Sequence, residues 1–167
     1  MNLRSAQRSD FPSILALNEE SVRFLSLLSP ERLAALDREA ELHVVIEQAG
    51  EVVAFLLALR QHANYDSVNY QWFELRYPSF LYIDRVVVAH DVQGRGAGSL
   101  LYQRAFSHAV EMGIPILACE FDFDPPNPVS ERFHTKFGFR EVGRQSVADG
   151  RKHVSLRVAA AGASHGA

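Results

Sequence analysis

Three glycines alternate in the sequence Val-Gln-Gly-Arg-Gly-Ala-Gly-Ser, which runs from Val92 to Ser99. This stretch joins an apolar run at Leu81–Val88 to a helical pattern over about 99–112. Glycine permits positive φ and a close approach of the backbone to a ligand, and the first turn of a helix offers unpaired N–H groups at the positive end of its dipole. We therefore expect backbone binding of a phosphate here; the alternative is an ordinary strand-to-helix turn. The candidate contacts are Gln93, Gly94, Arg95, Gly96, Ala97, Gly98 and Ser99.

Two other nucleotide-binding motifs do not fit this pattern. The glycines lack the G-x-G-x-x-G spacing of dinucleotide-binding folds, and the acid expected about 20 residues later is only Glu120, which lies too far along the chain. A Walker-type loop would need Gly-Lys-Ser/Thr, which is absent from this stretch. An anionic ligand that carries a pyrophosphate remains.

Two carboxylates are candidates for a base. Glu120 lies within an apolar, strand-like run over 114–123, where burial would raise its pKa. A solvated edge position or a structural ion pair is the alternative for this residue. Asp84 lies on one strand face with Tyr82, but the neighbouring Arg85 also invites a simple salt bridge. We rank Glu120 first as a base and Asp84 first as a binding group.

The segment 60–79 is both polar and aromatic, and we expect it to form an elaborated loop. Its five aromatic rings either pack over the sheet or line a ligand pocket, since cores and pockets both favour aromatic residues. Polar groups beside the rings are what a small cationic or amine ligand would need. The candidate binding residues are Tyr65, Asn69 and Trp72, together with Asn18 and Phe24 from the first helix and its loop.

Periodicity and turn signals predict the elements that position these residues. We expect strands at 2–6, 42–47, 51–59, 81–88, 114–123, 139–146 and 152–158, with helices after Asp10 and over 30–38, 99–112 and 129–137. The order β-α-α-β-β-β-α-β-α-β-β describes one α/β domain with a mixed sheet over residues 1–158. We expect the small-residue tail at 159–167 to be disordered.

Composition narrows the class of protein. The chain has 167 residues, 47% of them hydrophobic and 22% charged, which is ordinary for one globular domain. A net charge of −3 and the absence of a Lys/Arg cluster argue against a nucleic-acid partner. No apolar run approaches the roughly 20 residues that span a bilayer. The single cysteine, Cys119, excludes an intrachain disulfide, and the polar amino terminus predicts a cytoplasmic location.

With these features together, the chain resembles the GCN5-related N-acetyltransferase (GNAT) superfamily over almost its whole length. Gln93-Gly94-Arg95-Gly96-Ala97-Gly98, after the three valines at 86–88, matches that family's Arg/Gln-x-x-Gly-x-Gly/Ala signature. Asn127, Ser130, His134 and Gly138-Phe139 keep the register of its second signature. The resemblance implies a GNAT fold of the α/β (α+β) class, with a mixed, mostly antiparallel sheet of six to seven strands flanked by about four helices.

The resemblance also implies that acetyl-CoA is the co-substrate and that no metal is needed. The loop would bind the pyrophosphate, and backbone groups of the central strand would pair with the pantetheine arm. The implied cofactor contacts outside the loop are Val86, Val87, Val88, Asn127, Ser130 and Phe133. For Asn127 and Ser130, capping of the helix after Pro128 is the alternative role, and both roles can hold at once.

Catalytic roles follow from the same resemblance. A glutamate in the strand of Glu120 accepts the amine proton in several family members, often through water. His134 stands where the family commonly has a tyrosine that reaches the CoA sulfur, and an imidazolium could protonate the thiolate there. Tyr82 occupies the position of a glutamate found in some members, which argues against a histone-acetyltransferase-like mechanism. An acyl-cysteine route through Cys119 is disfavoured, because a free Cys in a strand usually behaves as a small buried hydrophobe.

The sequence therefore predicts a direct N-acetyltransferase for a small-molecule or amino-acid-like amine. A protein or peptide acceptor, or a non-catalytic acyl-CoA sensor, are the alternatives. An aminoglycoside acceptor would need an acidic cleft, and the acids available for one are scattered. We also expect a homodimer, because edge strands of the closing hairpin often pair between subunits in this family.

Overall fold

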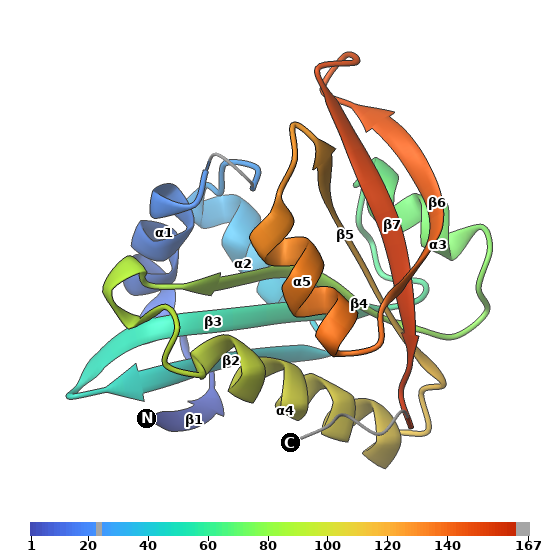
Figure 1. The fold of residues 1–167 in the computed structure, drawn as a ribbon. Helices are drawn as coiled ribbons and strands as arrows, with labels where there is room; N and C mark the ends of the chain where they lie inside the picture. The colour runs from blue at the N-terminus through green and yellow to red at the C-terminus, as the bar shows by residue number, and fades with distance from the viewer. Residues whose placement is uncertain (23–24, 163–167) are drawn as a thin grey trace.

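The computed structural model describes residues 1–22 and 25–162. Seven strands form one sheet in the order β1-β2-β3-β4-β5-β7-β6 (Figure 1). The strands are β1 (Asn2–Ser5), β2 (Leu42–Gln48), β3 (Glu51–Arg60), β4 (Leu81–Val88), β5 (Ile116–Asp124), β6 (Arg140–Val147) and β7 (Lys152–Ala160). The helices are α1 (Phe11–Glu20), α2 (Pro30–Glu39), α3 (Val68–Glu74), α4 (Ala97–Glu111) and α5 (Pro128–Lys136). Two 3₁₀ turns, η1 (Arg8–Asp10) and η2 (His90–Val92), precede α1 and the glycine-rich loop.

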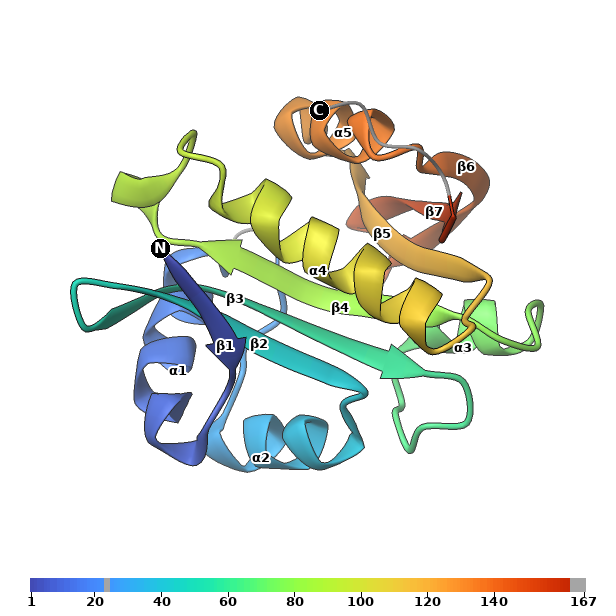
Figure 2. The same ribbon diagram turned by 90° about the horizontal axis from the view of Figure 1, so that it is seen from below.

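Helices cover both faces of the sheet. Figure 2 shows α4 across one face and α1 and α2 on the other. The apolar strand β3 contributes to both cores, because successive side chains point to opposite faces. Leu56 packs in the cluster that contains Leu101 of α4, whereas Phe55 packs in the cluster that contains Ile14 of α1 and Leu33 of α2.

The sheet opens between β4 and β5. These two strands are parallel, and the recorded pairs are Leu81 with Leu117 and Tyr82 with Ala118. Beyond Tyr82, β4 continues to pair with β3 as far as Val88, and β5 continues to pair with β7 as far as Asp124. The other neighbouring strands in the sheet pair antiparallel. The two central strands therefore share one end and separate toward the other.

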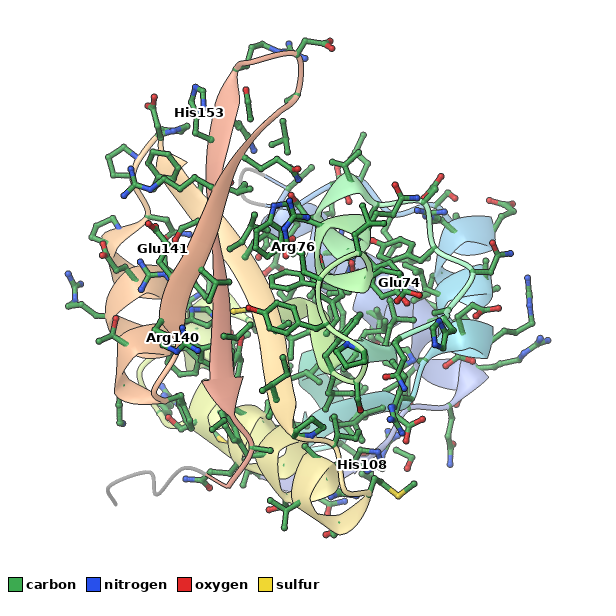
Figure 3. All side chains as sticks on the ribbon, turned by 90° about the vertical axis from the view of Figure 1, so that its right-hand side faces the viewer. Glu74, Arg76, His108, Arg140, Glu141 and His153 are labelled. Atoms are coloured by element: carbon green, nitrogen blue, oxygen red, sulfur yellow. The ribbon has the colours of Figure 1, made fainter. Side chains whose placement is uncertain are left out.

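The predicted element order is confirmed except in the aromatic segment. Residues 60–79 contain a short helix, α3, in which the Ser67 side chain accepts a hydrogen bond from the backbone N–H of Tyr70. Tyr70 and Phe73 are buried in the core on the α1–α2 face. Figure 3 shows α3 beside the β6–β7 hairpin, with Glu74 and Arg76 on the α3 side and Arg140 and Glu141 on the β6 side. A seven-residue helix was missed because its aromatic residues are not typical of helices.

Two element ends also differ from the expectation. Helix α4 begins at Ala97 rather than near Ser99, directly after Gly96. Strand β7 continues to Ala160, and Ala159 is buried because it pairs with Leu117 in the middle of the sheet. The expected tail therefore starts too early at 159, and residues 163–167 lie outside the described residues.

Candidate active site

A cleft of about 840 Å³ opens where β4 and β5 separate. It is lined by β4, the glycine-rich loop, the start of α4, β5 and one side of α5. The lining includes most of the predicted cofactor residues: Val86, Val87, Val88, Gln93, Gly94, Gly96, Ala97, Gly98, Ser99, Asn127, Ser130 and Phe133. Arg95 is the predicted cofactor residue that is not among the lining residues.

The glycine-rich loop leaves backbone donors available at one end of the cleft. Gly94 and Gly96 have φ of 80° and 89°, a region that favours glycine. No side chain of the described residues caps the N-terminus of α4, so its first N–H groups are not satisfied by a cap. Gly98 differs from the expectation, because it lies inside the helix; a Cβ there would lie 3.5 Å from the Phe133 ring, in ordinary contact. The geometry fits a phosphate group held by backbone N–H groups.

The valines of β4 border the cleft through their main chain. Val86, Val87 and Val88 pair with β3 on one side. On the other side, no pairing with β5 is recorded beyond Tyr82 in the described chain. One edge of this strand can therefore hydrogen-bond an extended ligand.

Glu120 lies on β5 just beyond the last β4–β5 pair, and it faces the cleft. The hydroxyl of Tyr82 donates to its carboxylate, with O–O distances of 2.8 and 2.7 Å to the two oxygens. Burial raises the pKa of Glu120 to about 8, although these hydrogen bonds favour the charged form. No ion pair to Glu120 is recorded within the described ranges, so neither a solvated edge position nor a structural ion pair describes it.

Two amides extend the contacts of Glu120 to elements outside the cleft. The Asn69 amide on α3 donates to Glu120 Oε1 at 3.3 Å. Asn69 in turn accepts a hydrogen bond from the Gln145 side chain of β6 at 2.8 Å. Sequence reasoning missed Gln145, because it lies 25 residues from Glu120 on an edge strand with no recognisable motif.

Asp84 also lines the cleft, but its charge is already compensated. Its carboxylate accepts hydrogen bonds from Arg85 Nε at 2.7 Å and from the Tyr65 hydroxyl at 2.5 Å. Arg85 is buried and also contacts Asn18 Oδ1 at 3.0 Å and the Ser26 side chain at 3.1 Å. The salt bridge that the sequence allowed is therefore present.

Most of the predicted acceptor residues do not line this cleft, Asp84 excepted. Tyr65, Asn69 and Asn18 lie behind Asp84, Glu120 and Arg85 and are not among the residues that line the cleft. Trp72 packs against β6, where a Cβ added to Gly143 would lie 2.4 Å from the Trp72 ring. The guanidinium group of Arg76 stacks on the same ring. Phe24 lies outside the described residues. The aromatic segment is thus mainly a packing layer that supports the carboxylates.

His134 does not have the environment of an imidazolium. Burial lowers its pKa to about 4, so the ring is neutral near pH 7. Its Nδ1 lies 2.7 Å from the Ser130 carbonyl oxygen, which can only accept, so Nδ1 carries the hydrogen. Nε2 then accepts from the Tyr102 hydroxyl at 2.6 Å. This environment argues against the predicted general-acid role of His134, because in this arrangement neither ring nitrogen offers a proton to the cleft.

Asn127 and Cys119 both have contacts that support the fold: Asn127 caps a helix, and Cys119 packs in the core. The Asn127 side chain caps α5 by accepting from the backbone N–H of Ser130 at 3.3 Å, as the sequence allowed. Cys119 is buried, and burial raises the pKa of its thiol well above the ordinary value. A thiol held protonated in this way disfavours an acyl-cysteine route.

A comparison with protein families matches residues 3–139 to the Acetyltransferase (GNAT) family. The chain belongs to the GNAT acetyltransferase family. Members of this family use acetyl-CoA, and the protein is accordingly a GNAT-type acetyltransferase with acetyl-CoA as its co-substrate. No curated protein matches the sequence significantly.

Solved structures share this GNAT fold across nearly the whole chain. The ribosomal-protein-S18-alanine N-acetyltransferase from Escherichia coli has a TM-score of 0.73 at 17% identity, covering 98% of this chain and 95% of its own. Ard1 from Thermoplasma volcanium has a TM-score of 0.76 at 18% identity, with coverages of 95% and 96%. The putative acetyltransferase yncA from Salmonella typhimurium, solved with acetyl-CoA, has a TM-score of 0.73 at 20% identity, with coverages of 100% and 96%.

Within its described residues, the GNAT domain carries neither a membrane-spanning helix nor a cluster of metal-ligating side chains. Among residues 1–22 and 25–162, no helix is long and apolar enough to cross a membrane. Within the same ranges, no group of three or more His, Cys, Asp or Glu side chains is placed to hold a metal ion.

Proposed function

We propose that this GNAT enzyme transfers the acetyl group of acetyl-CoA directly to the amine of a small-molecule or amino-acid-like acceptor, with Glu120 as the general base. The observation that carries the proposal is the position of Glu120. It is a half-buried carboxylate that faces the cleft at the point where β4 and β5 separate, and its pKa is raised to about 8. A base with this pKa can take a proton from an ammonium group near neutral pH.

Acetyl-CoA fits the rest of the cleft. The N–H groups of the glycine-rich loop and of the α4 N-terminus would hold its pyrophosphate, and the free edge of Val86–Val88 would pair with its pantetheine arm. Glu120 would take the proton from the acceptor, directly or through water. The amine nitrogen then forms a bond to the acetyl carbon as the carbon–sulfur bond breaks, and a β4 N–H would donate to the carbonyl oxygen.

The departing sulfur does not require His134 as an acid. A thiol has an ordinary pKa of about 8.5, so it can leave as a thiolate and take a proton from solvent. In the proposed mechanism, the hydrogen-bonded pair of Tyr102 and His134 fixes the wall of the cleft near α5.

The decisive experiment measures release of free thiol from acetyl-CoA with a panel of amines. Glu120→Gln should abolish release while acetyl-CoA binding, measured by calorimetry, persists. Glu51→Gln is the matched control, because Glu51 is an exposed residue at the start of β3 and does not line the cleft. Tight binding of acetyl-CoA with no release from any amine would contradict the enzyme mechanism and favour the sensor alternative.

A peptide acceptor is the second candidate. It is favoured by the likeness to ribosomal-protein-alanine N-acetyltransferases from Escherichia coli and from Brucella melitensis, at 17% and 22% identity. Peptides with free α-amines belong in the same panel, and a higher kcat/KM for them than for every small amine would replace the first proposal.

The proposed homodimer concerns β6, which is the last strand in the sheet order and pairs with β7. An edge strand presents unpaired backbone groups that a second copy could use. Light scattering on the purified protein tests this, with a monomer mass at micromolar concentration as the contrary result.

A further inference from the structure

A second carboxylate, Asp122, faces the cleft on the same strand as Glu120. The two residues are two positions apart on β5, so their side chains point to the same face. At about 3.3 Å per residue, their Cα atoms lie about 6.6 Å apart. Both residues line the cleft on the stretch of β5 where no pairing with β4 is recorded.

Asp122 is buried but only partly satisfied. Its side chain is 9% exposed, and its Oδ2 atom has no hydrogen-bond partner in the part of the chain that the structure describes. Lys152 Nζ on β7 lies 3.7 Å from this oxygen, which is an ion pair beyond hydrogen-bonding distance. A buried carboxylate oxygen without a hydrogen bond is costly, and such exceptions call for an explanation.

The other cleft carboxylates do not share this feature. Asp84 accepts from Arg85 and Tyr65, and Glu120 accepts from Tyr82 and Asn69. The pairing of β5 with β7 also shifts register between Asp122 and Asp124. Such irregularities occur often next to active sites, where they redirect a side chain. Glu20 also lines the cleft but is exposed to solvent. Asp122 is thus the buried cleft carboxylate whose counter-ion, Lys152, lies beyond hydrogen-bonding distance, so that one of its oxygens can accept a hydrogen bond from a ligand.

We propose that Asp122 binds a second cationic group of the acceptor. The acceptor is then a small diamine whose two nitrogens are separated by a chain of about four or five carbons. That length matches the spacing of about 6.6 Å between the two carboxylate positions along β5. This inference rests on the proposed function, because it takes Glu120 as the position of the reacting amine. An acceptor with one amine leaves Asp122 with only its long ion pair to Lys152, whereas a diamine supplies a hydrogen-bond donor to both carboxylates.

The first test compares amines of equal length in thiol release. We expect kcat/KM for 1,4-diaminobutane or 1,5-diaminopentane to exceed that of butylamine or pentylamine about tenfold or more, because hydrogen bonds to charged groups contribute more than neutral ones. 1,2-Diaminoethane should lose this advantage, since it is too short to reach both carboxylates. Equal kcat/KM values for monoamines and diamines would overturn the proposal. A peptide with a basic second residue whose kcat/KM exceeds that of every diamine would also overturn it.

The second test uses variants. Asp122→Asn should reduce the diamine-to-monoamine ratio to about one. Asp124→Asn removes the same charge from the same strand at an exposed position outside the cleft lining, and it should keep the ratio. Lys152→Gln should also keep or increase the ratio, because it removes the competitor for Asp122. If Asp122 only pairs with Lys152, the Asp122 and Lys152 variants will lose stability alike and both will keep the wild-type ratio.

Failure of this inference can be told from failure of the proposed function. If monoamines react as well as diamines and Glu120→Gln is inactive, the base proposal holds and the diamine proposal is wrong. If no amine releases thiol, calorimetry of diamines and monoamines against the CoA-bound protein still tests Asp122. Should Asp122→Asn fail to fold, the wild-type diamine-to-monoamine ratio decides.

Discussion

The hydroxyl of Tyr82 on β4 bridges to Glu120 on β5 at 2.8 and 2.7 Å, immediately past the last residues that pair these strands. One side-chain contact therefore takes over where the backbone pairing stops. Tyr82 is completely buried, and its hydrogen bond opposes the effect of burial on the Glu120 carboxyl. This relationship makes the pKa of Glu120 depend on a residue of the neighbouring strand.

Tyr82→Phe should shift the pH dependence of activity toward higher pH. The hydroxyl stabilises the carboxylate, so its removal raises the pKa of Glu120 above about 8, and the base is then deprotonated only at more alkaline pH. A hydrogen bond to a charged group contributes about 1.5–3 kcal/mol, which corresponds to a shift of about one to two pH units. The pH profile of kcat/KM measures it. Tyr77→Phe is the control, and an unmoved acid limb in Tyr82→Phe would contradict the role.

Asn69→Ala should have a smaller effect of the same sign, because its amide donates to Glu120 at 3.3 Å. Gln145→Ala should reproduce part of this effect, since Gln145 holds the Asn69 carbonyl at 2.8 Å without touching Glu120. Steady-state kinetics measured across pH should show this shift in kcat, with little change in KM for acetyl-CoA. A change confined to that KM would place both residues at the cofactor instead.

Glu120→Gln should make the protein more stable at alkaline pH. The folded-state pKa of about 8 lies above the ordinary value of 4.5, so folding keeps a proton that the unfolded chain loses between these values. The carboxyl therefore has no effect below about pH 4.5, and it lowers the free energy of unfolding increasingly as pH rises toward 8. We expect the variant to gain about 2–5 kcal/mol at pH 9 and nothing at pH 4. Urea unfolding at both pH values measures this, and an equal gain at both would contradict it.

His134→Asn should lower stability without removing a limb of the activity profile. The ring is neutral and hydrogen-bonded at both nitrogens, so its loss leaves the buried Tyr102 hydroxyl without its partner, at a cost of about 1–3 kcal/mol. Thermal unfolding and the pH profile of kcat/KM are the measurements. Disappearance of the alkaline limb would restore His134 as a general acid.

Gly143→Ala should destabilise the packing of α3 against β6. The added Cβ would lie 2.4 Å from the Trp72 ring, and overpacking of this kind costs about 1–3 kcal/mol. Combining the change with Trp72→Leu should recover part of the loss in urea unfolding. An unaltered midpoint in the single variant would show that the ring moves freely.

Much of the fold followed from periodicity and turn chemistry. The apolar runs at 51–60 and 81–88 are local patterns, and the glycines at 94 and 96 adopt the positive φ that their spacing suggested. The short helix α3 was not predictable in this way, because Tyr70 and Phe73 are held in it by packing under the sheet.

The roles of charged residues depended on contacts across the sequence. Asn18 and Tyr65 were reasonable acceptor residues on composition, yet they are occupied by Arg85 and Asp84. His134 kept the position of a signature residue, but burial and the Tyr102 hydroxyl determine its protonation state. A sequence pattern records the residue type and its register, whereas a pKa depends on neighbours from other elements.

The sequence by itself determined the family, the glycine-rich loop and the strand that carries Glu120, because each of these depends on residues adjacent in the chain. Only the tertiary structure decided where β4 and β5 separate, which carboxylates face the cleft, and which of them already have partners. Those properties arise from contacts such as Tyr82 with Glu120, which join residues 38 positions apart. Side chains so distant in sequence acquire their chemistry from the fold that brings them together.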